Sequence, residues 1–350
     1  MDKIRVLVVD DSAYNRQTIK SMLEKDEEIE VVAIATDGMD AMTKTIKLTP
    51  DVITLDFEMP NMDGFTFLRW LMQERPTPVI MVSSYSDSKM AFKALELGAV
   101  DFIAKPTRRA STELHNIEKD LIAKVKGTRQ LNMQVVKTKA MQHEEGAERG
   151  KQEDLLEVDL IAIGSSTGGP SALQNILTRL PADLPAAITI SQHMPKGFTK
   201  PLAERLDKLC GLSIKEAANG DLLKKGSVYI CPGGYHMEFK SRGNGIHLVI
   251  DESKPDDKYT PSVDRMMLSA ASHLGERILG VVLTGMGNDG MEGMKDLHKR
   301  GCFTIAEAEE TCVVFGMPQE VIKINAAKSV LPLDKIASEI RRQLMGERRA

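Results

Sequence analysis

Five short apolar runs, separated by stretches with helical periodicity, dominate residues 3 to about 126 and limit the folds open to this part of the chain. We predict strands at 6–9, 30–35, 52–55, 79–82 and 101–104. Strands that alternate with helices usually pair in parallel, because each helix carries the chain back before the next strand begins. The pattern therefore predicts an α/β fold with a doubly wound, flavodoxin-like sheet of five parallel strands.

Polar residues stand at the ends of four of these predicted strands. Asp10 and Asp11 follow the first run, Asp56 follows the third, and Ser83 and Lys105 follow the last two. In a parallel sheet these carboxyl ends share one edge, so the side chains are expected to lie together. One acidic strand end could be a helix N-cap or a solvated loop residue, but five polar groups at corresponding places favour a site. Carboxylates with a hydroxyl and an ammonium suit Mg²⁺ and a phosphoryl group.

This first domain resembles the receiver domain of response regulators over its whole length. The resemblance rests on Asp10-Asp11, on Asp56-Phe57-Glu58-Met59-Pro60-Asn61-Met62-Asp63-Gly64, on Ser83 and on Lys105-Pro106. It implies that Asp56 accepts a phosphoryl group from a histidine kinase, with Mg²⁺ as the cofactor. The other roles that it implies are Mg²⁺ binding by Asp10, Asp11, Asp56 and the Glu58 carbonyl, contact with the phosphoryl group by Ser83, ion pairing with it by Lys105, and the aromatic switch position for Phe102.

The composition of the whole chain disfavours several kinds of partner. Its 350 residues have room for two domains of ordinary size, and its formal net charge is −4, with scattered basic residues. We therefore expect no binding to nucleic acid, and no insertion into a membrane, because no apolar run approaches the length of a membrane span. The four cysteines lack C-x-x-C spacing, so we expect reduced thiols rather than zinc ligands and a cytoplasmic location.

A charged stretch separates the first domain from the rest of the chain. Residues 137–154 are rich in Lys, Glu, Gln and Arg and show no strand pattern. We predict a receiver domain at 1–126, a linker at 127–155 and a catalytic domain at 156–348. The charges could also form a solvated helix that continues the preceding one, so flexibility of this linker is an assumption.

The second domain opens with an apolar strand that runs into a glycine-flanked serine. Gly164, Ser166 and Gly168 form G-x-S-x-G, the spacing of a nucleophile elbow between a strand and a helix. The small flanking residues permit the sharp turn that lifts one hydroxyl above the sheet edge. A turn of this composition can also bind a phosphate at the helix N-terminus. The motif by itself leaves both interpretations open, because a serine nucleophile needs a base and an orienting acid.

Two further strand ends supply such a base and acid. His193 follows a predicted strand at 186–191, and Asp289 lies in the loop after one at 278–283. A parallel sheet would bring both to the edge that carries Ser166. We therefore predict His193 as the general base and Asp289 as the acid that orients it.

Other residues of the second domain complete or challenge this assignment. The glycine-rich turn around Met286 could offer backbone N–H groups to an oxyanion. His236 is the rival base, because it ends the motif Pro232-Gly233-Gly234-Tyr235-His236. A single histidine is more often structural than catalytic, so the strand-end position decides in favour of His193.

The second domain resembles the catalytic domain of the chemotaxis protein-glutamate methylesterases, the CheB family. Five motifs match in order, at 164–169, 192–195, 232–236, 283–290 and 314–318. Together with the receiver, the resemblance spans nearly the whole chain. It implies that Ser166 is the nucleophile, His193 the base and Asp289 its orienter, and that Thr167 and Met286 line the oxyanion region.

The resemblance also implies a reaction and its regulation. The reaction is hydrolysis of glutamyl methyl esters on methyl-accepting chemotaxis receptors to glutamate and methanol, with deamidation of specific receptor glutamines and no cofactor for the esterase. A receiver that covered the esterase would keep activity low until Asp56 is phosphorylated. Two other functions are open: a receiver-gated binding module without enzymatic activity, and a response regulator that acts on DNA. The ordered Ser, His and Asp disfavour the first, and the lack of a basic recognition helix disfavours the second.

Overall fold

The computed structural model describes residues 2–84, 88–105, 112–131, 133, 136, 158–254 and 256–345. The chain forms two compact units, residues 1–142 and residues 143–350, and each is described by itself. Most of the predicted linker and Pro106 lie outside the described residues, as does the side chain of Ser83, whose backbone belongs to a strand that ends one residue later. None of the helices in the described ranges is long and apolar enough to cross a membrane.

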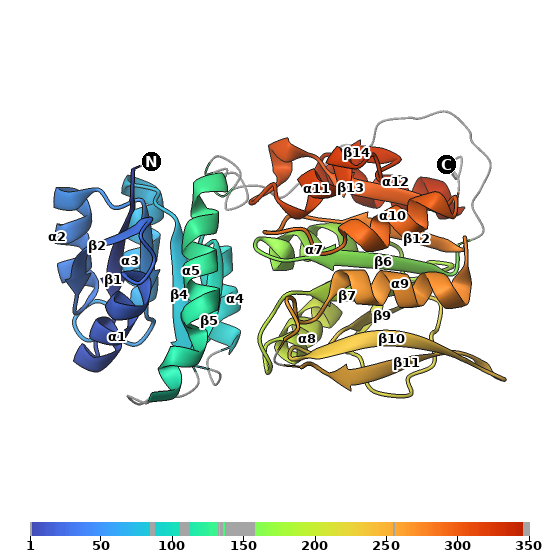
Figure 1. The fold of residues 1–350 in the computed structure, drawn as a ribbon, viewed down its shortest axis with the longest axis horizontal. Coiled ribbons are helices and arrows are strands. Elements are labelled where there is room, and N and C mark those ends of the chain that lie inside the picture. The colour runs from blue at the N-terminus through green and yellow to red at the C-terminus, as the bar shows by residue number, and fades with distance from the viewer. Residues whose placement is uncertain are drawn as a thin grey trace. The chain divides into compact units, whose positions relative to one another are not determined.

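The N-terminal unit is built on one sheet of five parallel strands in the order β2-β1-β3-β4-β5 (Figure 1). The strands are β1 (Ile4–Val9), β2 (Ile29–Ala35), β3 (Val52–Leu55), β4 (Val79–Ser84) and β5 (Asp101–Lys105). The central β1 and β3 are almost wholly buried, as expected when helices cover both faces of a sheet. The prediction of a doubly wound parallel sheet is confirmed.

Among the residues of this unit that the structure describes, five α-helices and two 3-10 helices accompany the sheet. They are α1 (Ala13–Leu23), α2 (Gly38–Leu48), α3 (Gly64–Glu74), α4 (Ser88–Glu96), a 3-10 helix (Thr112–Ile117), α5 (Glu118–Gly127) and a 3-10 helix (Thr128–Gln130). α1 packs beside α5, and α2 packs beside α3. Ser12, Asp37 and Asp63 are the N-caps of α1, α2 and α3, and their side chains accept hydrogen bonds from amides of the first turn. Each of these helices therefore begins close to a strand end.

The C-terminal unit has a sheet of seven strands in the order β14-β13-β12-β6-β7-β9-β8, with every pairing parallel (Figure 1). The strands are β6 (Leu160–Ser165), β7 (Ala187–Gln192), β8 (Ser213–Glu216), β9 (Ser227–Ile230), β12 (Ile278–Val282), β13 (Phe303–Glu307) and β14 (Ser329–Leu331). β6 lies between β7 and β12. The three strands that precede Ser166, His193 and Asp289 are therefore adjacent.

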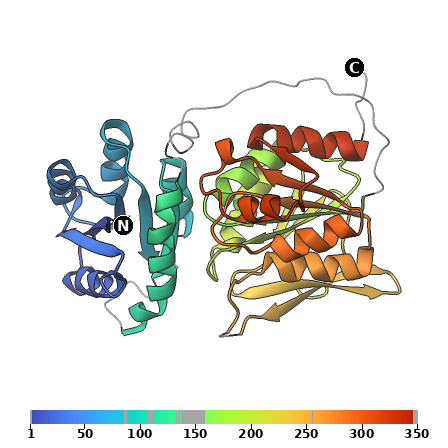
Figure 2. The ribbon, with the colours of Figure 1, turned by 45° about the horizontal axis from the view of Figure 1, so that its top comes forward.

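Helices cover this second sheet in two groups. They are α7 (Gly169–Leu177), α8 (Thr199–Leu209), α9 (Val263–Leu274), α10 (Met291–Lys299), a 3-10 helix (Glu309–Thr311), α11 (Met317–Lys323) and α12 (Leu333–Met345). α7 packs beside α8 and α12, whereas α10 packs beside α9 and α11 (Figure 2).

An antiparallel hairpin stands apart from the seven-stranded sheet. It consists of β10 (Tyr235–Arg242) and β11 (Gly245–Glu252), paired in register from end to end. Met237 and Phe239 of β10 and Leu248 of β11 are buried in the same core cluster as Met266 of α9. Because this apolar side of the hairpin packs on α9, the hairpin supports the helix whose N-terminus lies at the candidate site.

Candidate active site and phosphoacceptor site

The elbow after β6 distinguishes two adjacent serines. Ser165 ends β6 fully buried, and its hydroxyl donates to Gln192 Oε1 at 2.6 Å. Ser166 is partly exposed, and its backbone is fixed because its N–H donates to the Thr284 carbonyl at 3.0 Å. Gly168 has φ +80°, a conformation that favours glycine, and it precedes α7 directly. The Ser165 hydroxyl is therefore buried in a structural hydrogen bond, whereas Ser166 lies partly exposed at the sheet edge.

Gln192, which the sequence did not single out as a site residue, ties the elbow to the loop after β7. Its amide Nε2 donates to the carbonyl of Ser166 at 2.9 Å and to that of His193 at 3.0 Å. The His193 N–H in turn donates to the Ser165 carbonyl at 3.0 Å. Gly169 packs so closely that an added Cβ would lie 2.0 Å from Gln192 Oε1. These contacts fix the spacing between the serine and histidine loops.

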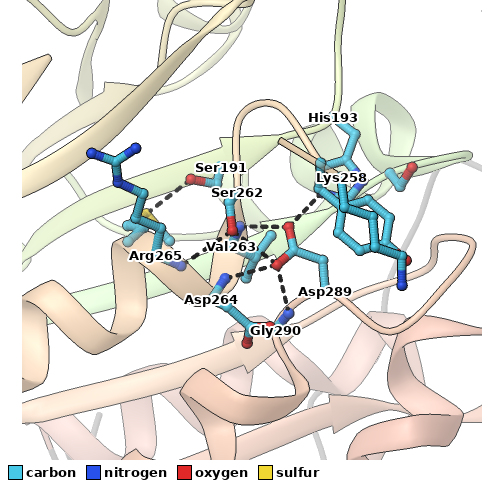
Figure 3. A network of polar contacts seen from close by, with 12 residues as sticks. Ser191, His193, Lys258, Ser262, Val263, Asp264, Arg265, Asp289 and Gly290 are labelled. Carbon is cyan, nitrogen blue, oxygen red and sulfur yellow. Dashed lines mark hydrogen bonds and ion pairs between the residues drawn. The ribbon is translucent and has the colours of Figure 1, made fainter. Parts of the chain in front are cut away.

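His193 and Asp289 form a hydrogen-bonded pair at the edge of the sheet (Figure 3). His193 follows β7 and Asp289 follows β12, as the sequence predicted, and the distance from His193 Nε2 to Asp289 Oδ2 is 2.8 Å. A carboxylate can only accept, so Nε2 carries the hydrogen and the neutral ring keeps its lone pair on Nδ1. Across the residues that the structure describes, no hydrogen bond joins the Ser166 hydroxyl to His193. Bonds of this kind often tighten only when substrate is bound.

The carboxylate of Asp289 sits on the N-terminus of α9 (Figure 3). It accepts from the amides of Val263 at 2.7 Å, Asp264 at 2.9 Å and Gly290 at 3.1 Å, and from the Ser262 hydroxyl at 3.1 Å. Burial acts to raise the pKa of Asp289, but the hydrogen bonds from His193 and from the backbone amides outweigh it, so the pKa lies below its ordinary value. Asp289 is therefore an anion that is only 1% exposed.

Asp264, in the first turn of α9, is a second acidic group that the sequence analysis missed. Its carboxylate accepts from the amide of Gly293 in α10 at 2.7 Å, which joins the two helix N-termini. Burial raises the pKa of Asp264 to about 6, the charge of Asp289 adds to the rise, and hydrogen bonds from Gly293 and Gly290 oppose it. Acidic residues are common in the first turn of helices, so the sequence offered no reason to single out Asp264.

His236, the rival base, is buried and has a partner at each ring nitrogen. Nε2 donates to Asp257 at 2.8 Å, and Nδ1 accepts from the Ser262 amide at 3.2 Å. The residue is 1% exposed. This arrangement anchors the segment 257–262 and leaves neither nitrogen to activate a nucleophile.

The turn that contains Met286 abuts the serine elbow. A Cβ added to Gly285 would lie 2.7 Å from Ser166 Cβ, so only glycine fits at this contact. The amides of Gly316 and Met317 donate to the Gly285 carbonyl, and the Thr284 hydroxyl donates to the carbonyl of Thr167 at 3.0 Å. Thr167, the next residue in the chain, and the turn that contains Met286 therefore both lie beside Ser166.

The acidic cluster of the N-terminal unit gathers around Lys105. Its ammonium lies 2.6 Å from Asp10 Oδ2 and 2.6 Å from Asp56 Oδ2. Burial, which is the largest effect, and the charge of Asp10 raise the pKa of Asp56 to about 6, against the opposing charge of Lys105. Asp11 completes a set with Asp10 and Asp56 whose nearest ligand atoms all lie within 4.8 Å of one another. Three carboxylates at this spacing fit a hard divalent cation.

Two more of the predicted receiver residues, and one that was not predicted, lie in this unit. Glu58 is exposed in the loop after β3. Phe102 is buried in β5, edge-on to Phe92 with 6.3 Å between the ring centroids. Asn15 was not predicted, but it is buried and its amide donates to both carboxylate oxygens of Asp10 at 3.3 and 3.4 Å.

Comparisons with known proteins agree with both units. A family model described as CheB methylesterase matches residues 161–340, and one described as response regulator receiver domain matches residues 6–117. A protein-glutamate methylesterase/protein-glutamine glutaminase of Geobacter sulfurreducens is 47% identical over 360 residues, which cover 97% of each chain. A relative of the same name from Symbiobacterium thermophilum is 45% identical over 97% of this chain and 96% of its own.

A solved structure matches the C-terminal unit. The crystal structure of the Thermotoga maritima CheB methylesterase catalytic domain aligns with 43% identity and a TM-score of 0.51, covering 52% of this chain and 97% of that one. Both domain models, the relatives that match almost end to end and this structure point to the same family. The chain belongs to the CheB family of protein-glutamate methylesterases/protein-glutamine glutaminases, which join a response-regulator receiver domain to a hydrolase domain.

Proposed function

We propose that this enzyme hydrolyses glutamyl methyl esters on the cytoplasmic helices of chemoreceptors, and deamidates specific receptor glutamines, through Ser166, His193 and Asp289. The observation that carries the proposal is the bond of 2.8 Å between His193 and the buried Asp289, on a strand end next to the one that bears Ser166. A histidine oriented by a carboxylate beside an accessible serine is the arrangement that nucleophilic acyl transfer needs.

The proposed reaction begins when Ser166 Oγ attacks the ester carbonyl carbon. Because Nε2 of His193 faces Asp289, the nitrogen that takes the serine proton is Nδ1. The carboxylate of Asp289 then stabilises the imidazolium. Backbone N–H groups of Thr167 and Met286 are the proposed donors to the oxyanion, because Thr167 follows the proposed nucleophile directly and the turn that contains Met286 abuts the elbow.

The acyl-enzyme forms when methanol leaves, and water then hydrolyses it. The bond between the carbonyl carbon and the methoxy oxygen breaks, and His193 returns its proton to the leaving group as methanol. Water then gives a proton to His193 and attacks the acyl carbonyl carbon. The bond from that carbon to Ser166 Oγ breaks, and His193 returns the proton to Oγ, which releases glutamate and restores Ser166. On a glutamine the leaving group is ammonia, and the other steps are unchanged. These steps use the protein's own side chains and water.

We also propose that phosphorylation of Asp56 by a chemotaxis histidine kinase raises the esterase activity. Asp10, Asp11, Asp56 and the carbonyl of Glu58 would hold Mg²⁺, which offsets the negative charge of the phosphoryl group. Lys105, which now bridges Asp10 and Asp56, would pair with the phosphoryl oxygens. Ser83 would contact the same oxygens, and Phe102 would respond as the aromatic switch. In the unphosphorylated state the receiver would keep receptor helices from the nucleophile.

The nucleophile is tested by comparing two serine variants of the full chain. Methanol release from receptor-containing membranes with labelled methyl esters should be lost in Ser166→Ala and largely kept in Ser165→Ala. The Ser165 variant is the matched control, because it removes a neighbouring hydroxyl that bonds Gln192. Methanol release by wild type no faster than spontaneous hydrolysis would support a non-enzymatic output module instead. Reversed losses would show that Ser165 is the nucleophile.

A further inference from the structure

Tyr259 lies against the proposed base, although no sequence motif marked it. Its ring is stacked on the imidazole of His193, with 5.1 Å between the ring centroids and 5° between the ring planes. The residue is partly buried in the segment that leads from β11 to α9. A parallel, close aromatic ring restricts the movement of its neighbour on one face.

The hydroxyl of Tyr259 also holds the loop that carries Asp289. It donates to Asn288 Oδ1 at 3.0 Å and accepts from the Asn288 amide at 3.3 Å. Gly287 has φ +80°, and a Cβ there would lie 2.4 Å from the tyrosine hydroxyl, so the contact requires glycine. One tyrosine therefore touches His193 through its ring and the neighbour of Asp289 through its hydroxyl.

The segment that carries Tyr259 is held on both sides. Asp257 accepts from His236, and the Ser262 amide donates to the same imidazole. Between these residues, Lys258 donates to Asn288 Oδ1 at 2.9 Å. The position of the tyrosine ring is thus set by several independent bonds to the hairpin and to the Asp289 loop.

The bond between His193 and Asp289 fixes one edge of the imidazole but not its plane. Rotation of the ring about an axis through Nε2 can keep this hydrogen bond, but it changes the direction in which Nδ1 points. A parallel ring at 5.1 Å opposes that rotation. Orientation of the base matters because small misplacements of catalytic groups cause large losses of rate.

We propose that Tyr259 is a positioning residue for the esterase and deamidase reactions, whose ring fixes the plane of His193 so that Nδ1 faces Ser166. The inference rests on the proposed roles of Ser166 and His193. It assigns to Tyr259 two separable contacts. The ring orients the base, and the hydroxyl secures the loop of Asp289.

The test uses the full chain with methylated receptor membranes and compares Tyr259→Leu with Tyr259→Phe. Leucine removes the stack, so kcat should fall about tenfold while KM stays within about twofold. Phenylalanine keeps the ring and loses the hydroxyl, so kcat should stay within about threefold of wild type. Tyr235→Leu is the matched control, because the Tyr235 ring instead faces the Lys196 ammonium at 5.1 Å.

A spectroscopic measurement reports the stack without reference to activity. In protein labelled with ¹³C at histidine Cε1, the His193 signal, assigned through His193→Gln, should be shifted upfield by the tyrosine ring. The shift should vanish in Tyr259→Leu and persist in Tyr259→Phe. Wild-type kcat in a folded Tyr259→Leu variant would overturn the inference, and so would a tenfold loss in Tyr259→Phe with the shift intact. Full activity of Ser166→Ala and His193→Gln would instead overturn the proposed function.

Discussion

Replacement of Asp289 by asparagine tests the proposed triad at its most constrained point. The carboxylate accepts five hydrogen bonds, two at Oδ2 from His193 and Val263, and three at Oδ1 from Ser262, Asp264 and Gly290. The asparagine side chain has nearly the same shape, but it has one oxygen and one NH₂ group. Its NH₂ group must therefore face N–H groups that now donate to one of the carboxylate oxygens. The substitution therefore changes hydrogen bonding and charge while it leaves the volume almost unchanged.

The two orientations of the introduced asparagine differ in their consequences. With its NH₂ group in place of Oδ2, it faces the Val263 amide and His193 Nε2. His193 must then accept at Nε2, which moves its proton to Nδ1 and blocks the proposed base. With its NH₂ group in place of Oδ1, it faces the amides of both Asp264 and Gly290. The first orientation leaves fewer N–H groups without acceptors and should prevail.

We expect kcat to fall about 10³- to 10⁴-fold in Asp289→Asn, because the histidine is held in the wrong tautomer. The buried N–H of Val263 loses its acceptor, which should lower the free energy of unfolding by about 1–3 kcal/mol. Methanol release and urea denaturation of the full chain measure the two effects. Asp257→Asn is the matched variant, because Asp257 pairs with His236 at the same 2.8 Å. It breaks a hydrogen bond of the same length away from the proposed base, so kcat should fall by less than about tenfold. Asp289→Asn with kcat within tenfold of wild type would refute the reasoning.

Two further predictions concern the charge of Asp264 and the control of the esterase. Because burial raises the pKa of Asp264 to about 6, the folded state binds its proton more tightly than the unfolded state, and this contribution to stability is lost as pH rises from about 4 to about 6. Over that range the unfolding free energy of Asp264→Asn should rise by about 1 kcal/mol relative to that of wild type, after allowance for solvent screening. Urea denaturation at several pH values measures this difference, and a difference that stays constant would show that the pKa of Asp264 is not raised. Asp56→Asn should take up no phosphate from acetyl phosphate with Mg²⁺, and its esterase should stay low. Removal of residues 1 to about 150 should raise basal methanol release, and a truncated chain no faster than the unphosphorylated full chain would exclude simple occlusion.

The parts of the site that the sequence revealed are those at the ends of buried parallel strands. β6, β7 and β12 are apolar runs because both faces of the sheet are covered, so each run shows where its strand ends. His193 and Asp289 could be placed on one edge from this pattern, and their bond was then found. In the receiver the same logic brought Asp10, Asp56 and Lys105 together.

The parts that the sequence did not reveal belong to connections with no repeating pattern. Tyr259 lies in a short segment whose path depends on the hairpin, on His236 and on the Asp289 loop, all distant in sequence. Gln192 was visible as the residue before His193, but its two amide bonds depend on how β6 and β7 pair. Such roles follow from tertiary contacts, and local periodicity does not encode them.

The proposed acid of the triad is also part of a helix cap, which couples catalysis to folding at one point. The Arg265 amide in the first turn of α9 donates to the Ser262 hydroxyl, and this hydroxyl donates to Asp289. Two more amides of the same turn donate directly to the carboxylate. These donors carry partial positive charge, so they keep Asp289 ionised in a buried site where burial favours the neutral acid. The anion in turn satisfies amides that a helix N-terminus leaves unpaired. A change that weakens this cap should therefore make α9 less stable and leave His193 less well oriented. Both effects are expected even though none of the capping groups contacts the substrate in the proposed reaction.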